Sequence, residues 1–249
     1  MFAEKILHKL GKYFIFLATM VTNRERFRVY PKLVLEECVL IGIDSIFIVA
    51  VVSLFIGAVT CIQAAANLVS PLVPMYVVGT VVRDMEILEL APTITCVVLA
   101  GKVGSSIAGN LGTMRITEQI DALEVIGINS SSYLVLPKIL GAMLMFPLLV
   151  SVSGYLGLLG GYIAGEISGA VYGEEYIFGI RSGFNAMNVT LALVKSVVFA
   201  FLISSISAFQ GFFTNGGALE VGKSSTNAVT NSCIAVLVAD YLLAQLFLA

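Results

Sequence analysis

Five long stretches of this sequence are almost free of charged side chains, and this feature limits the fold more than any other. Each stretch holds at most two Asp, Glu, Lys or Arg residues, and the five cover about residues 44–68, 88–111, 133–167, 189–212 and 228–247. A helix needs about 20 mostly apolar residues to cross the hydrocarbon core of a bilayer. The sequence therefore predicts an all-α, polytopic membrane protein with five transmembrane helices.

The composition agrees with that class and excludes several others. Of the 249 residues, 58% are hydrophobic and only 12% are charged, whereas a soluble domain has about 25% charged residues. The net charge of −2 gives no basic excess that would favour binding to nucleic acid. His8 is the single histidine, so a multi-histidine metal site is excluded. We expect no metal and no cofactor.

The first 37 residues differ from the rest of the chain. At helical spacing the polar residues of the first turns share one face; they are Lys5, His8, Lys9 and Lys12. They also interrupt the apolar run that a signal peptide needs. The pattern predicts an amphipathic helix in the membrane surface, although a solvated, disordered tail remains the alternative. We divide the chain into this helix with a basic linker, 1–37, and a transmembrane domain, 38–249.

The distribution of basic residues predicts the orientation. Half of the fourteen Lys and Arg residues lie before residue 38: Lys5, Lys9, Lys12, Arg24, Arg26, Arg28 and Lys32. Cytoplasmic segments next to the membrane are enriched in Lys and Arg. The N-terminus is therefore predicted to be cytoplasmic, and five crossings place the C-terminus on the opposite side.

One compact charged segment, at about 115–127, separates the second and third apolar stretches. Its polar residues are Arg115, Thr117, Glu118, Gln119, Asp121 and Glu124. We expect Thr117 to be the N-cap, with acidic residues in the first turn and Gly127 ending the helix. The carboxylates of Glu118, Asp121 and Glu124 form an acidic ridge without an obvious basic partner. The segment is a candidate cytoplasmic docking helix; a merely solvated linker helix is the alternative.

Small residues recur every four positions in two of the apolar stretches. The main positions are Gly104, Ala108 and Gly112 in the second stretch, and Gly157, Gly161 and Gly165 in the third. Residues four apart share a helix face, and small ones let helix backbones approach closely. Helix packing is the favoured interpretation, and a direct substrate path is the alternative.

Three ionisable residues within the apolar stretches are candidates for a binding site. Such residues are costly in a membrane and usually face a cavity or a partner. Lys195 and Asp240 are expected to lie at similar depths and to pair, and Glu89 is expected to begin the second span and line a polar vestibule. A purely structural ion pair is the alternative.

The charged segment and its surroundings resemble a known family. The stretch "LAGKVGSSIAGNLGTMRITEQIDALEVIGIN" is similar to the signature of the MlaE/YrbE-type permeases, which are membrane subunits of ABC transporters associated with MCE proteins. The resemblance continues in "FIGAVTCIQ", "LELAP" and "AVLVADYLLAQLF" and covers about residues 30–247.

The resemblance implies a function that spacing alone does not. It implies a homodimer in the bacterial inner membrane that binds two cytosolic ATPase subunits and an MCE-domain protein on the periplasmic side, and that moves phospholipids between membranes. The charged segment would be the coupling helix that docks on the ATPase. Residues matching the family's lipid cavity are Glu89, Lys195, Asp240 and Gln63. The family often has Arg before that Glu, where this chain has Leu88.

Two other functions fit the residues. The chain has no phosphate loop of its own. Around "GKVGSS", the motif G-x-x-x-x-G-K-[ST] would need Gly at position 96 and Ser or Thr at position 103, but the chain has Cys96 and Val103. An ion-coupled secondary transporter would use Glu89, Lys195 and Asp240 as a relay and need no ATPase. A non-transporting scaffold would tolerate apolar replacements at these positions.

Overall fold

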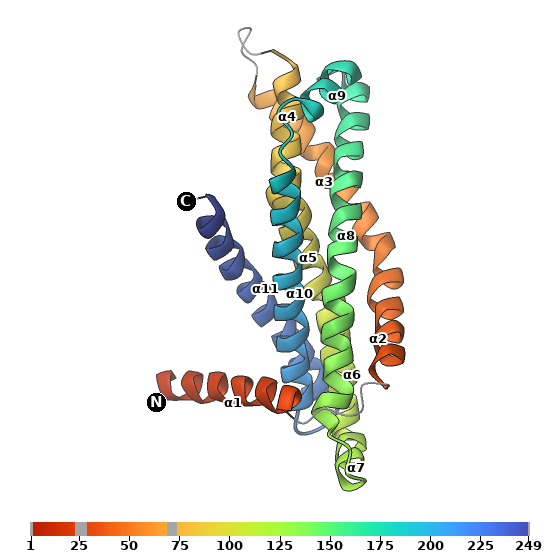
Figure 1. Cartoon of the computed structure of the whole chain (residues 1–249), viewed down its shortest axis with the longest axis vertical. Coiled ribbons are helices and arrows are strands. Elements are labelled where there is room, and N and C mark those ends of the chain that lie inside the picture. Colours follow the sequence, from red (N-terminus) through yellow and green to blue (C-terminus); the bar gives the residue numbers. More distant parts are fainter. Residues whose placement is uncertain (1, 23–28, 69–73, 249) are drawn as a thin grey trace. The chain divides into compact units, whose positions relative to one another are not determined.

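The chain is an all-helical protein in the computed structural model, which describes residues 2–22, 29–68 and 74–248 (Figure 1). Within these residues, five helical stretches are long and apolar enough to cross a membrane: Tyr30–Asn67, Tyr76–Ile116, Ser130–Ser168, Ala186–Phe212 and Ala218–Phe247. The predicted all-α class with five spans is confirmed. Arg24, Arg26 and Arg28, and the side chain of Lys5, lie outside the described part of the chain.

The helices follow one another with short connections. Their order is α1 (Phe2–Thr22), α2 (Tyr30–Cys38), η1 (Val39–Ile43), α3 (Asp44–Asn67), α4 (Tyr76–Met85), η2 (Glu86–Ile94), α5 (Thr95–Leu99), η3 (Ala100–Gly104), α6 (Ser105–Ile116), α7 (Gln119–Val125), α8 (Ser130–Ser168), α9 (Gly173–Arg181), α10 (Ala186–Phe212) and α11 (Ala218–Leu248), where η marks π-helix.

Three of the predicted spans begin too late, and the first of them starts at Tyr30 rather than near residue 44. The second stretch starts at Tyr76 rather than near residue 88, because α4 and η2 continue directly into α5. Tertiary packing buries the charged residues Arg83 and Glu86 of this region, at 4% and 1% exposure. The fifth stretch starts at Ala218 rather than near residue 228, because a polar first part of α11 is helical as well.

The chain forms two compact units, and several helices contribute to both. The first unit comprises Met1–Ile43, Leu99–Met145 and Phe199–Val238. The second unit comprises Asp44–Val98, Phe146–Val198 and Ala239–Ala249. The predicted boundary at residue 37 falls inside the continuous stretch Tyr30–Asn67; the proposed division into a surface segment and a membrane domain stays a prediction.

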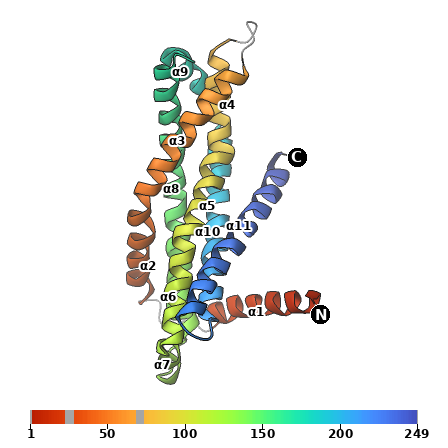
Figure 2. The ribbon, with the colours of Figure 1, turned by 180° about the vertical axis from the view of Figure 1, so that it is seen from behind.

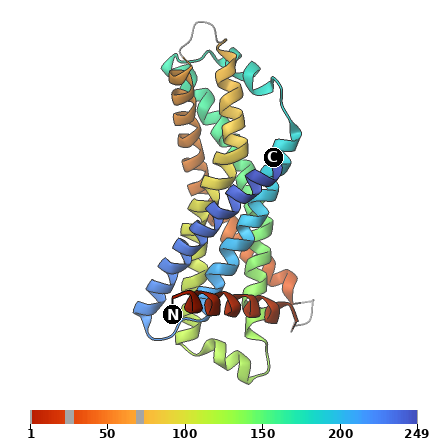
Figure 3. The same ribbon diagram turned by 90° about the vertical axis from the view of Figure 1, so that its left-hand side faces the viewer.

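In the first unit, α1 crosses the end of α10 instead of running along it (Figures 1 and 3). Phe16 anchors the crossing, with ring centroids 5.3–5.9 Å from those of Phe209, Phe212 and Phe213. The Tyr13 hydroxyl lies 2.7 Å from Ser205 Oγ. Burial raises the pKa of Tyr13, and the hydrogen bond to Ser205 partly offsets this. The predicted N-terminal helix is therefore present and held by aromatic packing.

The small-residue face of the second stretch packs against α10 and α11 in the same unit. A Cβ on Gly104 would lie 2.9 Å from Ser207 Oγ, and one on Gly112 would lie 3.1 Å from a methyl of Val221. Ala108 is fully buried, and a Cβ on Gly211 of α10 would come within 2.6 Å of its carbonyl oxygen. These positions bring helix backbones close together.

In the second unit, glycines allow α8 to touch α3, and α9 to touch α4. A Cβ on Gly57 would collide with the Gly157 carbonyl, and one on Gly179 would collide with the Tyr76 carbonyl. Figure 2 shows α9 beside α4, in agreement with Figure 1. Tyr176 of α9 is 1% exposed and donates to the Leu158 carbonyl at 3.2 Å. Burial, more than its neighbours Cys61 and Glu86, raises the pKa of Tyr176.

The π-helix η2 changes the direction in which its side chains point. Pro92 lies inside it and has no N–H to donate to the preceding turn. Its wider turns replace the regular i→i−4 pattern over Glu86–Ile94. Sequence periodicity of 3.6 residues therefore does not describe this segment, which carries Glu86 and Glu89.

Candidate functional site

Lys195 of α10 is the centre of a buried charge cluster in the second unit. Its Nζ lies 2.9 Å from Glu89 Oε1, 2.7 Å from Asp240 Oδ1 and 3.1 Å from the Leu88 carbonyl oxygen. Thr93 donates a hydrogen bond to the other Asp240 oxygen at 3.0 Å. The structure thus brings together three predicted site residues from three different helices, η2, α10 and α11.

The cluster holds two carboxylates for one ammonium group, so its formal charge is −1. The contact with Asp240 is an ion pair by distance, although its direction does not meet hydrogen-bond geometry. The exposed fraction of the side chain is 1% for Lys195, 15% for Asp240 and 46% for Glu89. Lys195 is therefore sealed inside the cluster, and Glu89 is the member that a ligand can reach.

The position of Glu89 differs from the predicted one. We expected it at the start of a span, but the helix begins at Tyr76, so Glu89 lies well inside the second helical stretch. The sequence analysis expected Glu89 to line a vestibule, and Lys195 to pair with Asp240. In the structure Glu89 lines a cavity and also pairs with Lys195. Glu86 of the same π-helix has a different neighbour and lies against Gly157 of α8.

Glu89 and Gln63 line one cavity of about 410 Å³ in the second unit. It lies among α3, α4 and η2, and its lining is Thr60, Gln63, Ala64, Asn67, Leu68, Val81, Met85, Glu89 and Leu90. The polar groups are a carboxylate, two amides and a hydroxyl, and the other side chains are apolar. Such a lining suits an amphiphilic ligand, since a few placed polar groups in an apolar wall are typical of binding pockets.

Glu86 is a buried carboxyl group that the sequence analysis missed. It is 1% exposed, and its Oε2 has no hydrogen-bond partner. It fills the space left by Gly157 of α8, where a Cβ would collide with its carboxylate. The signal was present in "MEILEL", where a second acidic residue lies three positions before Glu89.

Arg83, one turn earlier, serves a different part of the same unit. Its Nη1 donates to the carbonyls of Ile180 and Ser182 at 3.0 and 2.5 Å, and its guanidinium pairs with Asp84 at 2.9 Å. The guanidinium therefore fastens the C-terminal end of α9 to α4. These contacts lie on the α9 side of α4 and do not involve the Lys195 cluster.

The charged segment folds differently from its predicted form. Thr117 is not the N-cap of the charged helix but the C-cap of α6, and its hydroxyl donates back to the Thr113 carbonyl at 2.8 Å. The N-cap of α7 is Glu118, in the left-handed region at φ 60°. The left-handed conformation of Glu118 interrupts the helix after Thr117, so the charged helix begins later, at Gln119.

The acidic ridge also has partners within the chain, contrary to expectation. Arg115 Nη1 lies 2.6 Å from Asp121 Oδ1, so the single nearby basic residue is used. Ser130 donates to Glu124 Oε1 at 2.6 Å. Glu118 remains exposed, and Gly127 has a positive φ of 84° just beyond α7. The ridge still faces outward, but with less unpaired charge than the sequence predicted.

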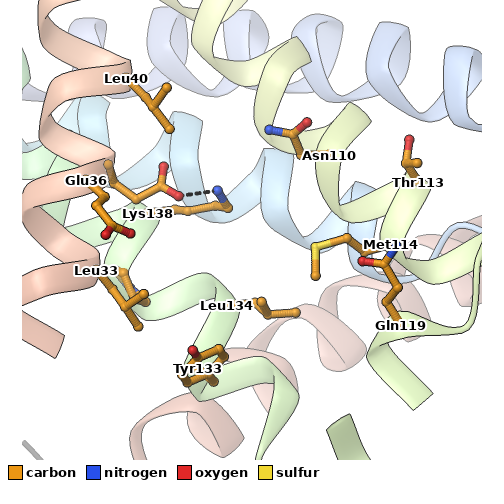
Figure 4. A pocket seen from close by; sticks show the side chains of 12 residues that line it. Leu33, Glu36, Leu40, Asn110, Thr113, Met114, Gln119, Tyr133, Leu134 and Lys138 are labelled. Atoms are coloured by element: carbon orange, nitrogen blue, oxygen red, sulfur yellow. Dashed lines mark hydrogen bonds and ion pairs between the residues drawn. The ribbon is translucent and has the colours of Figure 1, made fainter. Parts of the chain in front are cut away.

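A second cavity, of about 500 Å³, lies in the first unit beside α7 (Figure 4). Gln119 of α7 and Asn110 of α6 line one side of it, and α2 and α8 line the other. The buried ammonium of Lys138 pairs with Glu37 in its wall. The sequence analysis missed this pair because its members are 101 residues apart and each looks like an isolated charge.

The described side chains form features that could bind a ligand or a partner. Within residues 2–22, 29–68 and 74–248, His, Cys, Asp and Glu side chains form no group of three that would hold a metal ion. The arrangement contains a buried ion cluster beside an amphiphilic cavity in one unit, and a short charged helix in the other.

Comparison with known proteins gives matches over nearly the whole chain. A family profile described as Permease MlaE matches residues 34–246. A "Probable ABC transporter permease protein" of Rickettsia bellii is 35% identical over 243 residues, covering 98% of this chain and 93% of the relative. A protein of the same description from Synechocystis is 33% identical, covering 88% and 83%. TRIGALACTOSYLDIACYLGLYCEROL 1, a chloroplast protein of Arabidopsis thaliana, is 37% identical over 64% of this chain and 45% of its own length.

Proposed function

The chain belongs to the MlaE permease family of ABC transporter permeases, and on that premise we propose that its substrate is a phospholipid moved between two membranes. The cavity lined by Glu89 and Gln63 carries this proposal. It offers polar groups to a headgroup and an apolar wall to the adjoining acyl chains. The name of the Arabidopsis relative refers to a galactolipid, which supports a lipid substrate.

The energy for transport comes from another subunit in this proposal. As an ABC transporter permease the chain is not the subunit that hydrolyses ATP, and its family implies an ATPase partner. We propose that α7 docks on that ATPase. In support, α7 is short, and its neighbour Glu118 is exposed. The buried Ile120 fixes the helix to its own unit, so that movement of a docked partner is transmitted to α6 and α8.

The assembly and orientation are part of the same proposal. The chain is a multi-pass membrane protein; we place it in a bacterial inner membrane as a homodimer, with an MCE-domain protein on the periplasmic side. The N-terminus is cytoplasmic, since half of the Lys and Arg residues precede residue 38. Five spans then put the C-terminus in the periplasm. An ion-coupled carrier would work without an ATPase. Membership of an ABC permease family implies an ATPase partner and therefore favours the ATP-driven transporter over such a carrier.

Filling the cavity tests the proposed function. Gln63→Trp places a large side chain in the cavity, whereas Val59→Trp changes a residue of the same helix that is 52% exposed and does not line it. The complex is purified with its ATPase, bound phospholipid is measured by mass spectrometry, and ATP-driven transfer of a labelled phospholipid is followed in liposomes. We expect Gln63→Trp to lose both signals and Val59→Trp to retain them. Equal behaviour of the two variants would place the substrate path elsewhere.

A further inference from the structure

We propose that this cavity selects phospholipids whose headgroup carries an ammonium group over those with a purely anionic headgroup, and that Glu89 makes the selection. The inference rests on the proposed function, because it names the substrate class of the same cavity. It depends on three observations: the charges that line the cavity, which of these charges are already paired within the protein, and which are exposed to a ligand.

The first argument is the charge of the wall. Among the residues that the structure describes, Glu89 is the one ionisable side chain that lines the cavity. Gln63, Asn67 and Thr60 are neutral, and the remaining side chains are apolar. A headgroup in this cavity therefore meets a carboxylate and amides, and no exposed cation is available to neutralise an extra phosphate charge.

The second argument is that the nearby cation, Lys195, is already paired with carboxylates of the protein. An ammonium group has three N–H donors, and Lys195 Nζ faces three acceptors: Glu89, Asp240 and the Leu88 carbonyl. The Lys195 side chain is 1% exposed. It is hydrogen-bonded to Glu89 and the Leu88 carbonyl, is ion-paired with Asp240, and has no free surface for a phosphate, so it acts on the ligand only through Glu89.

The third argument is the charge balance of the cluster. Lys195 is shared by two carboxylates, which leaves a net formal charge of −1. Glu89 is 46% exposed and Asp240 only 15%, so the uncompensated charge is accessible at Glu89. A headgroup ammonium beside Glu89 would give two cations for two carboxylates. An anionic headgroup would instead add a like charge, which complementary binding sites avoid.

The neutral polar residues fit the rest of such a headgroup. A zwitterionic phospholipid also carries a phosphate, whose oxygens need donors. The amide groups of Gln63 and Asn67 supply N–H donors without a positive charge, and both side chains are exposed. The cavity therefore provides a carboxylate for the ammonium and amides for the phosphate.

A competition between two lipids tests the inference. The full chain, with any subunits that co-purify, is exchanged into micelles with equal amounts of phosphatidylethanolamine and phosphatidylglycerol, and the bound lipids are counted by native mass spectrometry. We expect phosphatidylethanolamine to be enriched about fivefold, the ratio that one half-exposed charge contact gives. Glu89→Gln should bring the ratio near one. This variant should fold, because Asp240 still neutralises Lys195, and thermal unfolding in detergent checks that it does.

The control is Glu174→Gln, which changes an exposed carboxylate on α9 of the same unit, outside the cavity lining. It should keep the wild-type ratio. A wild-type ratio near one, or a preference that Glu89→Gln leaves intact, overturns the inference while bound lipid still supports the proposed function. Absence of any bound phospholipid would contradict the proposed function itself.

Discussion

The Lys195 cluster and the α7 segment both concentrate charge, but their surroundings are opposite. Lys195 is 1% exposed and contacts three acceptors. In the α7 segment, Arg115 and Asp121 are paired at 2.6 Å but are 29% and 49% exposed. Removing one member of a buried pair leaves a charge without solvent, whereas an exposed pair exchanges its partner for water.

The difference indicates what each region does. A buried cluster fixes the arrangement of η2, α10 and α11, and a change there acts first on folding. Charges on an exposed helix contribute little to folding, so they are available for binding a partner. A mutation in the Lys195 cluster should therefore change mainly the stability of the protein, whereas a mutation in the α7 segment should change mainly its association with a partner.

The largest effect is expected from removing the cation of the cluster. Lys195→Met leaves Asp240 and Glu89 without their shared partner and should lower the free energy of unfolding by about 3–5 kcal/mol. The double variant Lys195→Met with Asp240→Asn should lower the free energy of unfolding by less, because the remaining carboxylate, Glu89, is half-exposed. Denaturation in mixed micelles measures both variants and Asp240→Asn alone.

The matched control for that experiment is Lys223→Met, which removes an exposed lysine paired with Glu220 at 2.7 Å. Its cost should stay within about 1 kcal/mol. If the costs of Lys195→Met and Asp240→Asn simply add in the double variant, the two residues do not interact in the protein, and the contrast between the regions fails.

A smaller but clear effect is expected at Gly157, which leaves space for Glu86. Gly157→Ala puts a methyl group into the Glu86 carboxylate and the α3 contact, and should cost about 1–3 kcal/mol by overpacking. Gly222→Ala is the matched control, because a Cβ there meets nothing within 4 Å on a helix; it should be neutral or stabilise by about 0.5–1 kcal/mol. Thermal melts in detergent compare them. Equal shifts would show that the close approach at Gly157 does not exist.

The smallest effect on the chain itself is expected in the acidic ridge. Changing Glu118, Asp121 and Glu124 together to Lys should alter the permease's own stability by about 1 kcal/mol or less per exposed pair. The same change reverses the charge offered to the ATPase and should abolish its co-purification and transport. Membrane levels, and the mass of the proposed homodimer, should remain normal. A triple variant that keeps its ATPase and activity at ordinary salt would show that the ridge is not the docking surface.

Much of the architecture was decided by the sequence on its own. Long uncharged stretches predict membrane helices because a bilayer offers no water to backbone groups or charges, and five such stretches were found. The TEQIDALE segment was enough to suggest the family that the comparisons later showed. These features are local or compositional, and they can be read without knowing which helices touch.

Only the tertiary structure decided how the buried charges are used. Lys195 and Glu89 are 106 residues apart, so no local pattern predicts that one ammonium serves two carboxylates. Helical periodicity does not describe η2, a π-helix that contains Pro92 and carries Glu86 and Glu89. The capping preference of Thr117 was misleading as well, because the left-handed Glu118 makes Thr117 the C-cap of α6. A side chain's partner depends on packing between distant segments, and packing is what sequence spacing does not contain.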